Sequence, residues 1–135
     1  TGHGVGAFLN VHEGPQRIAP RGADEPMKVG MIVSNEPGYY EPGWGGVRLE
    51  NLYVVMTADG LPNHPDGKRW FRMDPLTLIP FDTSLIDWSE MSEAEKVWLL
   101  DYHQEVWNKI SPMLDDDDSQ WLWGKCQLPN ITISA

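Results

Sequence analysis

The sequence predicts an α+β chain in which antiparallel strands come first and helices follow. Two strand-like segments flank a turn rich in Gly and Pro, and after residue 80 the apolar residues adopt helical spacing. At 135 residues the chain has the length of about one domain, and an apolar fraction of 41% with seven Trp argues against disorder. The sequence therefore favours a folded domain with one modest core.

The N-terminal part predicts a pair of strands joined by a turn. Residues 1–6 are rich in Gly and are expected to be irregular, and the polar residues 15–30 are expected to form a surface loop. Strands are predicted at residues 31–36 and 47–56, because both segments combine β-branched and other apolar residues. Residues 37–46 hold two prolines and four glycines, so this segment must turn. The simplest geometry is an antiparallel pair.

The C-terminal part predicts a further strand and two helices. Residues 72–80 are expected to form a strand. Pro75 lacks an amide hydrogen, so this strand is expected either to lie at a sheet edge or to start late. Ser92 and Glu95 have the spacing of a capping box, and apolar residues near helical spacing continue to about residue 111. A short second helix is expected around residues 119–125.

The charge of the chain is acidic and uneven. The formal net charge is −10, of which −2 falls on residues 1–80 and −8 on residues 81–135. Such a field repels phosphate backbones, so no nucleic-acid partner is expected. No apolar run approaches the roughly 20 residues of a membrane helix, so no membrane partner is expected either. The run Asp115–Asp118 is interpreted as a solvated loop that favours the start of the next helix, with a cation site as the alternative.

One histidine and two glutamates form the candidate metal site. Glu36 ends the first predicted strand, Glu50 lies in the second, and antiparallel pairing can bring them together, with His3 as the third ligand. One imidazole and two carboxylates suit a catalytic divalent cation that keeps an open position. Alternatively, Arg48, on the same face as Glu50, forms a salt bridge with either carboxylate. The residues alone leave both alternatives open.

Five ordered segments carry a further signal. They are Thr1–Gly6, Asn10–Pro15, Ser34–Tyr40, Val47–Asn51 and Asp74–Pro80. Together they resemble the motifs of the Xaa-Pro aminopeptidase (aminopeptidase P) family, and the resemblance spans essentially the whole chain. It implies the C-terminal portion of a pita-bread metallopeptidase fold. Residues 1–80 would be the incomplete C-terminal half of the catalytic domain, and residues 81–135 its helical C-terminal extension.

The resemblance implies a metal-dependent aminopeptidase that releases the first residue of peptides with proline in second position. Proline lacks an N–H and has a fixed φ, so such an enzyme needs a dedicated pocket for the ring. One alternative is a related pita-bread peptidase, either prolidase or methionine aminopeptidase. The other is a non-catalytic pita-bread binding module that has lost the metals.

The resemblance also implies a role for each matching residue. His3, Glu36 and Glu50 match metal ligands, and Glu36 is also assigned the general-base role. His12 matches a histidine that contacts substrate near the leaving group, and Arg48 matches an arginine that supports the site. The family generally uses two divalent ions, most often Mn²⁺, which oxygen-rich ligation suits. Zn²⁺ and Co²⁺ are the alternatives.

The matched region lacks two aspartate ligands and further histidines, which family members supply from an upstream segment. Two divalent ions bring four positive charges, whereas Glu36 and Glu50 bring one negative charge each. We therefore expect a C-terminal fragment that is inactive alone, and that forms a homo-oligomer or associates with the missing N-terminal part. The single Cys126 suits a reducing compartment, and a cytoplasmic location is expected.

Overall fold

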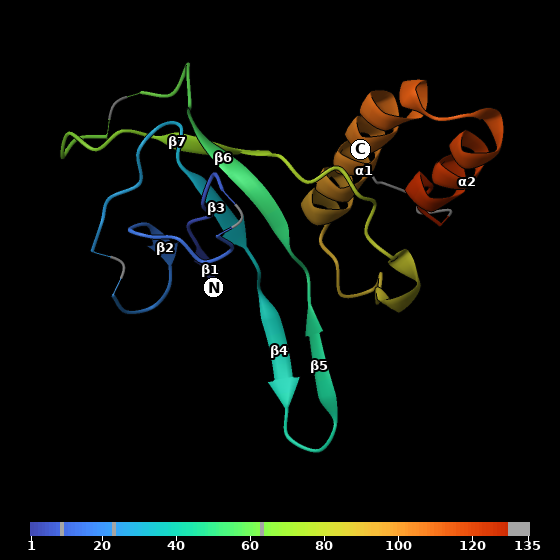
Figure 1. The fold of residues 1–135 in the computed structure, drawn as a ribbon, viewed down its shortest axis with the longest axis horizontal. Coiled ribbons are helices and arrows are strands. Elements are labelled where there is room, and N and C mark those ends of the chain that lie inside the picture. The colour runs from blue at the N-terminus through green and yellow to red at the C-terminus, as the bar shows by residue number, and fades with distance from the viewer. Residues whose placement is uncertain (9, 23, 63, 130–135) are drawn as a thin grey trace. The chain divides into compact units, whose positions relative to one another are not determined.

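The computed structural model describes residues 1–8, 10–22, 24–62 and 64–129 (Figure 1). The chain divides into two compact units, Thr1–Thr77 and Leu78–Ala135. The described strands all lie in the first unit, and the described helices all lie in the second. The predicted α+β class, with antiparallel strands followed by helices, is therefore confirmed.

The described part of the first unit holds seven short strands. They are β1 (Gly2–His3), β2 (Arg17–Ile18), β3 (Ile32–Asn35), β4 (Gly38–Glu41), β5 (Gly45–Arg48), β6 (Asn51–Thr57) and β7 (Phe71–Pro75). Their pairings are antiparallel, in the strand orders β1-β2, β3-β6-β7 and β4-β5. An isolated bridge between Gly4 and Val33 joins the N-terminal segment to β3. The strand that carries His3 therefore lies beside β3.

One hairpin register runs through the ladders β3–β6 and β4–β5. The facing pairs include Ile32–Val54, Asn35–Asn51 and Gly38–Arg48. In this register Glu36 lies directly opposite Glu50. Pro37 interrupts the ladder because it has no amide hydrogen, although its carbonyl accepts a 3.2 Å hydrogen bond from Leu49. The prediction of one unbroken strand over residues 47–56 is therefore wrong, because β5 ends at Arg48 and β6 begins at Asn51.

The N-terminal segment differs from the sequence-based expectation. The irregular segment expected over residues 1–6 contains β1 (Gly2–His3), and the loop expected over residues 15–30 contains β2. Each of these strands is two residues long and pairs with a partner distant in sequence, so no local pattern reveals it. β7 also ends at Pro75, before the end of the strand predicted over residues 72–80.

The second unit is helical. Its elements are the 3₁₀ helices η1 (Thr83–Leu85) and η2 (Ser111–Met113) and the α-helices α1 (Glu93–Ile110) and α2 (Asp116–Cys126). The predicted capping box starts α1, since Ser92 Oγ accepts from the Glu95 amide at 3.3 Å and Glu95 Oε2 accepts from the Ser92 amide at 2.8 Å. The loop expected for the aspartate run is wrong beyond Asp115, because Asp115 caps α2 by accepting from the Asp118 amide at 2.9 Å.

The core of the second unit joins α1 to α2. Its buried members are Leu99, Tyr102, Val106, Leu122 and Cys126. His103 is also fully buried: its Nε2 accepts a 3.0 Å hydrogen bond from the Phe81 amide, and its Nδ1 lies 3.3 Å from the Cys126 carbonyl. This imidazole therefore links the segment before the helices to α1 and to the end of α2.

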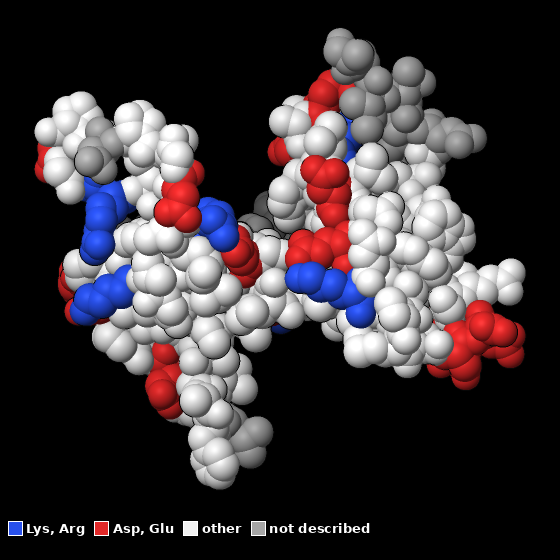
Figure 2. Space-filling view, turned by 90° about the horizontal axis from the view of Figure 1, so that it is seen from above, with Lys and Arg blue, Asp and Glu red and all other residues white. Residues whose placement is uncertain are grey.

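Acidic and basic side chains are interspersed on the face shown in Figure 2. On that face the basic atoms of the described residues form small separate groups with acidic atoms between them. Of the helices in the described ranges, none is long and apolar enough to cross a membrane.

Candidate functional site

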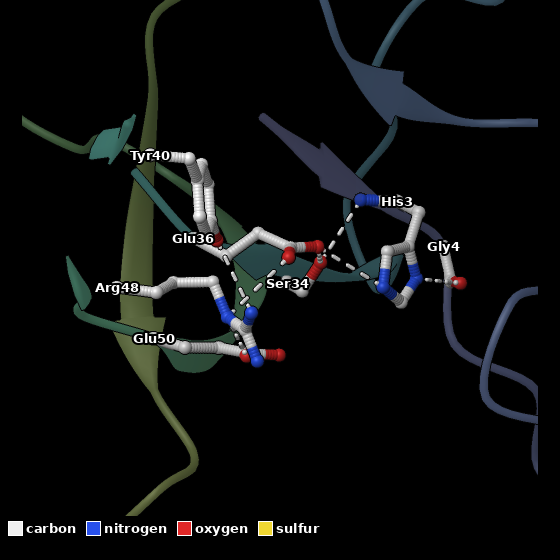
Figure 3. Close-up of polar contacts among 7 residues, drawn as sticks. All are labelled: His3, Gly4, Ser34, Glu36, Tyr40, Arg48 and Glu50. Atoms are coloured by element: carbon white, nitrogen blue, oxygen red, sulfur yellow. Dashed lines mark hydrogen bonds and ion pairs between the residues drawn. The ribbon is translucent and has the colours of Figure 1, made fainter. Parts of the chain in front are cut away.

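Five polar side chains from neighbouring strands gather at one point of the first unit (Figure 3). They are His3, Ser34, Glu36, Arg48 and Glu50. Ser34 and Glu36 are two residues apart along one arm of the hairpin, and Arg48 and Glu50 are two residues apart along the other. Because strand side chains alternate between faces, the members of each pair share a face. The register therefore brings both pairs together.

Glu36 and Glu50 form a closely spaced pair across the hairpin. The Glu36 amide points away from Glu50, since it donates to the Thr1 carbonyl at 2.9 Å. Facing residues that do not exchange backbone hydrogen bonds have Cα atoms about 4.5 Å apart, which places their side chains closest. Two carboxylates in such positions repel each other unless a proton or a cation lies near both.

The imidazole of His3 faces the carboxylate of Glu36. His3 Nε2 lies 3.1 Å from Glu36 Oε1, and the two side chains are only 23% and 19% exposed. The other ring nitrogen, Nδ1, lies 2.9 Å from the Gly4 carbonyl oxygen. A carbonyl oxygen only accepts, so the hydrogen of a neutral His3 resides on Nδ1. The Nε2 lone pair then points at a carboxylate oxygen.

The glycines beside His3 allow its strand to approach the neighbouring backbone. A Cβ atom on Gly2 would lie 2.0 Å from the Ser34 carbonyl oxygen, and one on Gly4 would lie 2.0 Å from the Glu13 carbonyl oxygen. Neither position has room for a side chain. The sequence around His3 is thus adapted to hold its imidazole against β3.

Arg48 lies between the two glutamates. Its Nε is 3.0 Å from Glu50 Oε2 and 3.8 Å from Glu36 Oε2. Its Nη1 donates to the Tyr40 hydroxyl at 3.2 Å. The hydrogen bond to Tyr40 is the main cause that raises the pKa of Arg48 above its usual range, and the hydrogen bond to Glu50 is the second cause. In this structure the guanidinium is therefore the cation that separates the facing carboxylates.

Tyr40 is held by two glycines on the same face. A Cβ atom on Gly46 would lie 2.4 Å from the Tyr40 ring, and one on Gly38 would lie 2.8 Å from the Tyr40 hydroxyl oxygen. A side chain at either position would push the Tyr40 ring away, so the ring keeps this place because both residues are glycines. This contact places the hydroxyl within reach of Arg48.

His12 lies beside His3. The centroids of the two rings are 4.3 Å apart, with a tilt of 49° between the ring planes. Both residues line a cavity of about 260 Å³, together with parts of residues 1–4 and 12–19. The cavity is open to solvent, so a small ligand group that enters it can reach His3 and His12.

The structure brings the predicted site residues together in two groups. His3 contacts Glu36 and lies beside His12, while Arg48 contacts Glu50. Within the described residues, no three His, Cys, Asp or Glu side chains are arranged to hold one ion. Arg48 Nε lies within ion-pair distance of both carboxylates, 3.0 Å from Glu50 and 3.8 Å from Glu36, as the salt-bridge alternative expects. The roles assigned to these residues stay predictions.

Two contributors to the cluster are not among the residues singled out from the sequence. Ser34 donates to Glu36 Oε1 at 3.0 Å, and Tyr40 accepts from Arg48. The strand periodicity contains a signal for both, because Ser34 and Tyr40 lie an even number of residues from Glu36 and so share its face.

Two family profiles match the chain. "Metallopeptidase family M24" matches residues 1–57, and "C-terminal region of peptidase_M24" matches residues 69–128. A probable Xaa-Pro aminopeptidase P of Coprinopsis cinerea is 51% identical over 127 residues, which cover 93% of this chain and 20% of that protein. Aminopeptidase P2 of Arabidopsis thaliana is 51% identical over 125 residues, which cover 91% of this chain and 18% of that protein.

A solved structure is similar as well. X-prolyl aminopeptidase from Caenorhabditis elegans, described as a cytosolic enzyme with a di-nuclear active site, matches with a TM-score of 0.80 and 35% identity. The match covers 94% of this chain and 21% of that one. The chain therefore spans about a fifth of the length of these relatives.

Proposed function

This chain belongs to metallopeptidase family M24, and on that basis we propose that it forms part of the catalytic centre of an Xaa-Pro aminopeptidase. Such an enzyme hydrolyses the bond between the first residue of a peptide and a proline in second position. Relatives named as aminopeptidases P, 51% identical to this chain, support the proposal. Prolidase, methionine aminopeptidase and a non-catalytic binding module are the alternatives that an experiment must separate.

The arrangement of His3 and Glu36 is the observation that carries the proposal. A neutral His3 with its hydrogen directed at the Gly4 carbonyl presents a lone pair to Glu36 Oε1 at 3.1 Å. This contact is unfavourable unless a proton or a metal cation lies between the two atoms. Metal-binding histidines almost always donate their second ring nitrogen to a carbonyl, a carboxylate or water, as His3 does.

The donor set fits one divalent ion more readily than two. Ligand atoms bound to a common ion at about 2.0–2.2 Å lie roughly 3 Å apart. The 3.1 Å between His3 Nε2 and Glu36 Oε1 agrees with this spacing. Glu50 would be the third ligand once its carboxylate leaves Arg48. We propose that the complete centre holds two ions, with Mn²⁺ as the first candidate and Zn²⁺ or Co²⁺ as the alternatives. Because these three side chains suit one ion, a second ion requires further ligands.

Each side chain then has a distinct task. When bound, the ions would lower the pKa of a water molecule and polarise the scissile carbonyl. Glu36 accepts a proton from the attacking water and passes it to the proline nitrogen as the peptide bond breaks. His12, next to His3, contacts the substrate near that leaving nitrogen. Arg48 offsets the repulsion between Glu36 and Glu50.

The proposed setting of the enzyme is the cytoplasm, with peptides as substrates. The description of the C. elegans relative as cytosolic supports this location. Homo-oligomerisation, or association with a further part of the protein, stays a prediction.

Substrate profiling of the complete encoded protein, loaded with Mn²⁺, tests the proposal. The release of the first residue is measured by mass spectrometry from a tripeptide with proline in second position, an Xaa-Pro dipeptide and a Met-Ala tripeptide. Release from the proline tripeptide is expected. Hydrolysis of the dipeptide alone would indicate a prolidase, and release from the Met-Ala peptide alone a methionine aminopeptidase. No hydrolysis and no Mn²⁺ binding would favour the binding module and contradict the proposal.

A further inference from the structure

We propose that Ser34 is a positioning residue that sets the distance between His3 and Glu36. This inference rests on the proposed function, because it takes both side chains as ligands of a divalent cation. The side chain of Ser34 is fully buried, with 0% of the residue exposed, and lies where the N-terminal segment meets β3 (Figure 3). It therefore acts through its hydrogen bonds rather than by contact with a substrate.

The hydrogen bonds of Ser34 have a fixed direction. The His3 amide donates to Ser34 Oγ at 3.0 Å, and Ser34 Oγ lies 3.0 Å from Glu36 Oε1. An amide nitrogen only donates and a carboxylate only accepts, so the single hydroxyl hydrogen must point at Glu36. This directed chain joins the backbone of one proposed ligand to the side chain of the other.

Ser34 and Arg48 lie nearest to opposite oxygens of the Glu36 carboxylate. Ser34 holds Glu36 Oε1, the oxygen that faces His3, whereas Arg48 Nε is 3.8 Å from Glu36 Oε2. That distance is too long for a hydrogen bond. Without the serine hydroxyl, the carboxylate is free to turn towards the permanently charged guanidinium and tighten its 3.8 Å ion pair into a hydrogen-bonded salt bridge like that of Glu50. Ser34 thus keeps Glu36 available to a cation that His3 also binds.

The Mn²⁺ affinity of the complete encoded protein, measured by isothermal titration calorimetry, tests this role. Ser34→Ala should weaken Mn²⁺ binding by about 10- to 100-fold, the usual effect of losing a group that orients a metal ligand. Ser34→Thr keeps the hydroxyl and should bind close to wild type. Ser34→Cys keeps the size of the side chain but donates only weakly, so it should bind less tightly than wild type.

A double variant separates positioning from a merely structural role. Arg48→Gln removes the guanidinium that competes for Glu36, so the Ser34→Ala/Arg48→Gln protein should bind Mn²⁺ more tightly than Ser34→Ala alone. Arg48→Gln alone also removes a positive charge beside the proposed ligands, so the gain in the Ser34→Ala background must exceed the gain that Arg48→Gln gives the wild-type protein. Equal gains in the two backgrounds would indicate that Ser34→Ala binds weakly because its fold is damaged. Thermal unfolding of each metal-free protein shows which variants are folded, and Ser34→Thr and Ser34→Cys decide the question if Ser34→Ala does not fold.

The outcomes distinguish the inference from the function on which it rests. Wild-type affinity in Ser34→Ala, equal losses in Ser34→Ala and Ser34→Thr, or a gain from Arg48→Gln no larger in Ser34→Ala than in the wild type would overturn the role of Ser34 alone. Mn²⁺ binding by the wild type without Xaa-Pro cleavage would overturn the proposed activity and leave the affinity comparison valid. A wild-type protein that binds no Mn²⁺ would overturn both.

Discussion

The two units of this chain are held together in different ways. In the second unit, five buried side chains from α1 and α2 form a hydrophobic core. In the described part of the first unit, the buried hydrophobic side chains are Val33 and Val55, and antiparallel ladders supply most of the order. The candidate site belongs to the unit with the smaller core.

This difference shows that strand register, rather than core packing, places the candidate ligands. A slip of one residue in a strand would move its side chains to the opposite face, so Glu36 would no longer face Glu50. In the helical unit, by contrast, substitutions should act on stability through lost packing. Variants that target each unit can therefore test whether site geometry and core stability are separate.

The largest expected effect is on catalysis in the first unit. Glu36→Gln should lower kcat for Xaa-Pro cleavage by about 10²- to 10⁴-fold, because an amide does not accept the proton from water. Glu41→Gln is the matched control, since the Glu41 carboxylate accepts from the Tyr39 hydroxyl at 2.7 Å, away from the cluster. Steady-state kinetics on a proline tripeptide measures both variants. Similar losses in the two would argue against a special role for Glu36.

The next largest effect is expected on the core of the second unit. Leu99→Ala should destabilise this unit by roughly 2–5 kcal/mol, because the 2% exposed side chain leaves a cavity. Leu100, one residue along α1 and 40% exposed, provides the control, and Leu100→Ala should cost less than about 1 kcal/mol. Hydrogen–deuterium exchange of the α1 amides reports the stability of this unit directly. Equal exchange rates in the two variants would contradict the assignment of the core.

The parts of the fold predicted from sequence are those with local signals. The capping box of Ser92 and Glu95 starts α1 as predicted, and the pita-bread expectation is confirmed by the match to a solved X-prolyl aminopeptidase. The failures occur where the partner is distant or the signal is ambiguous. β1 has no pattern of its own, and the aspartates after Asp115 are compatible with both a loop and a first helical turn.

The sequence predicts which residues form the candidate site, but not which contacts they make. Alternation along one strand places Arg48 and Glu50 on the same face, and antiparallel pairing can bring Glu36 opposite them. Which partner each carboxylate prefers depends on differences of about an ångström, such as 3.0 Å against 3.8 Å from Arg48 Nε. Arg48 is also hydrogen-bonded to Tyr40, whose ring packs against Gly38 and Gly46, and no periodicity encodes such contacts.

A pH effect of intermediate size is expected in the second unit. Burial lowers the pKa of His103 from its ordinary value of 6.5, and Nε2 must stay unprotonated to accept from the Phe81 amide. The unfolded chain therefore takes up the proton first as the pH falls. The contribution of neutral His103 to the free energy of unfolding is fully present above about pH 6.5. Below that pH the contribution falls, by up to about 1.4 kcal/mol per pH unit.

The comparison of wild type with His103→Gln checks this pH effect. Glutamine cannot be protonated in this range. The opening free energy of the α1 amides, obtained from exchange rates corrected for the intrinsic rate at each pH, should therefore depend less on pH between about 7.5 and 5.5. The variant will be less stable than wild type at neutral pH, so the informative quantity is the difference between the two slopes of opening free energy against pH. Parallel pH profiles would show that another group controls the acid sensitivity of this unit.

The smallest effects are expected from the substitution of one glycine in each unit. A Cβ atom on Gly124 in α2 would meet no described atom within 4 Å outside its own helical backbone, so Gly124→Ala should stabilise the helix by about 0.5–1 kcal/mol. The same change at Gly2 places a Cβ atom 2.0 Å from the Ser34 carbonyl oxygen, so Gly2→Ala should weaken Mn²⁺ binding by displacing His3. Thermal unfolding measures the stability of Gly124→Ala, and isothermal titration calorimetry measures the Mn²⁺ affinity of Gly2→Ala. If Gly2→Ala bound Mn²⁺ as wild type does, β1 would not be fixed against β3, and strand register would no longer explain where His3 lies.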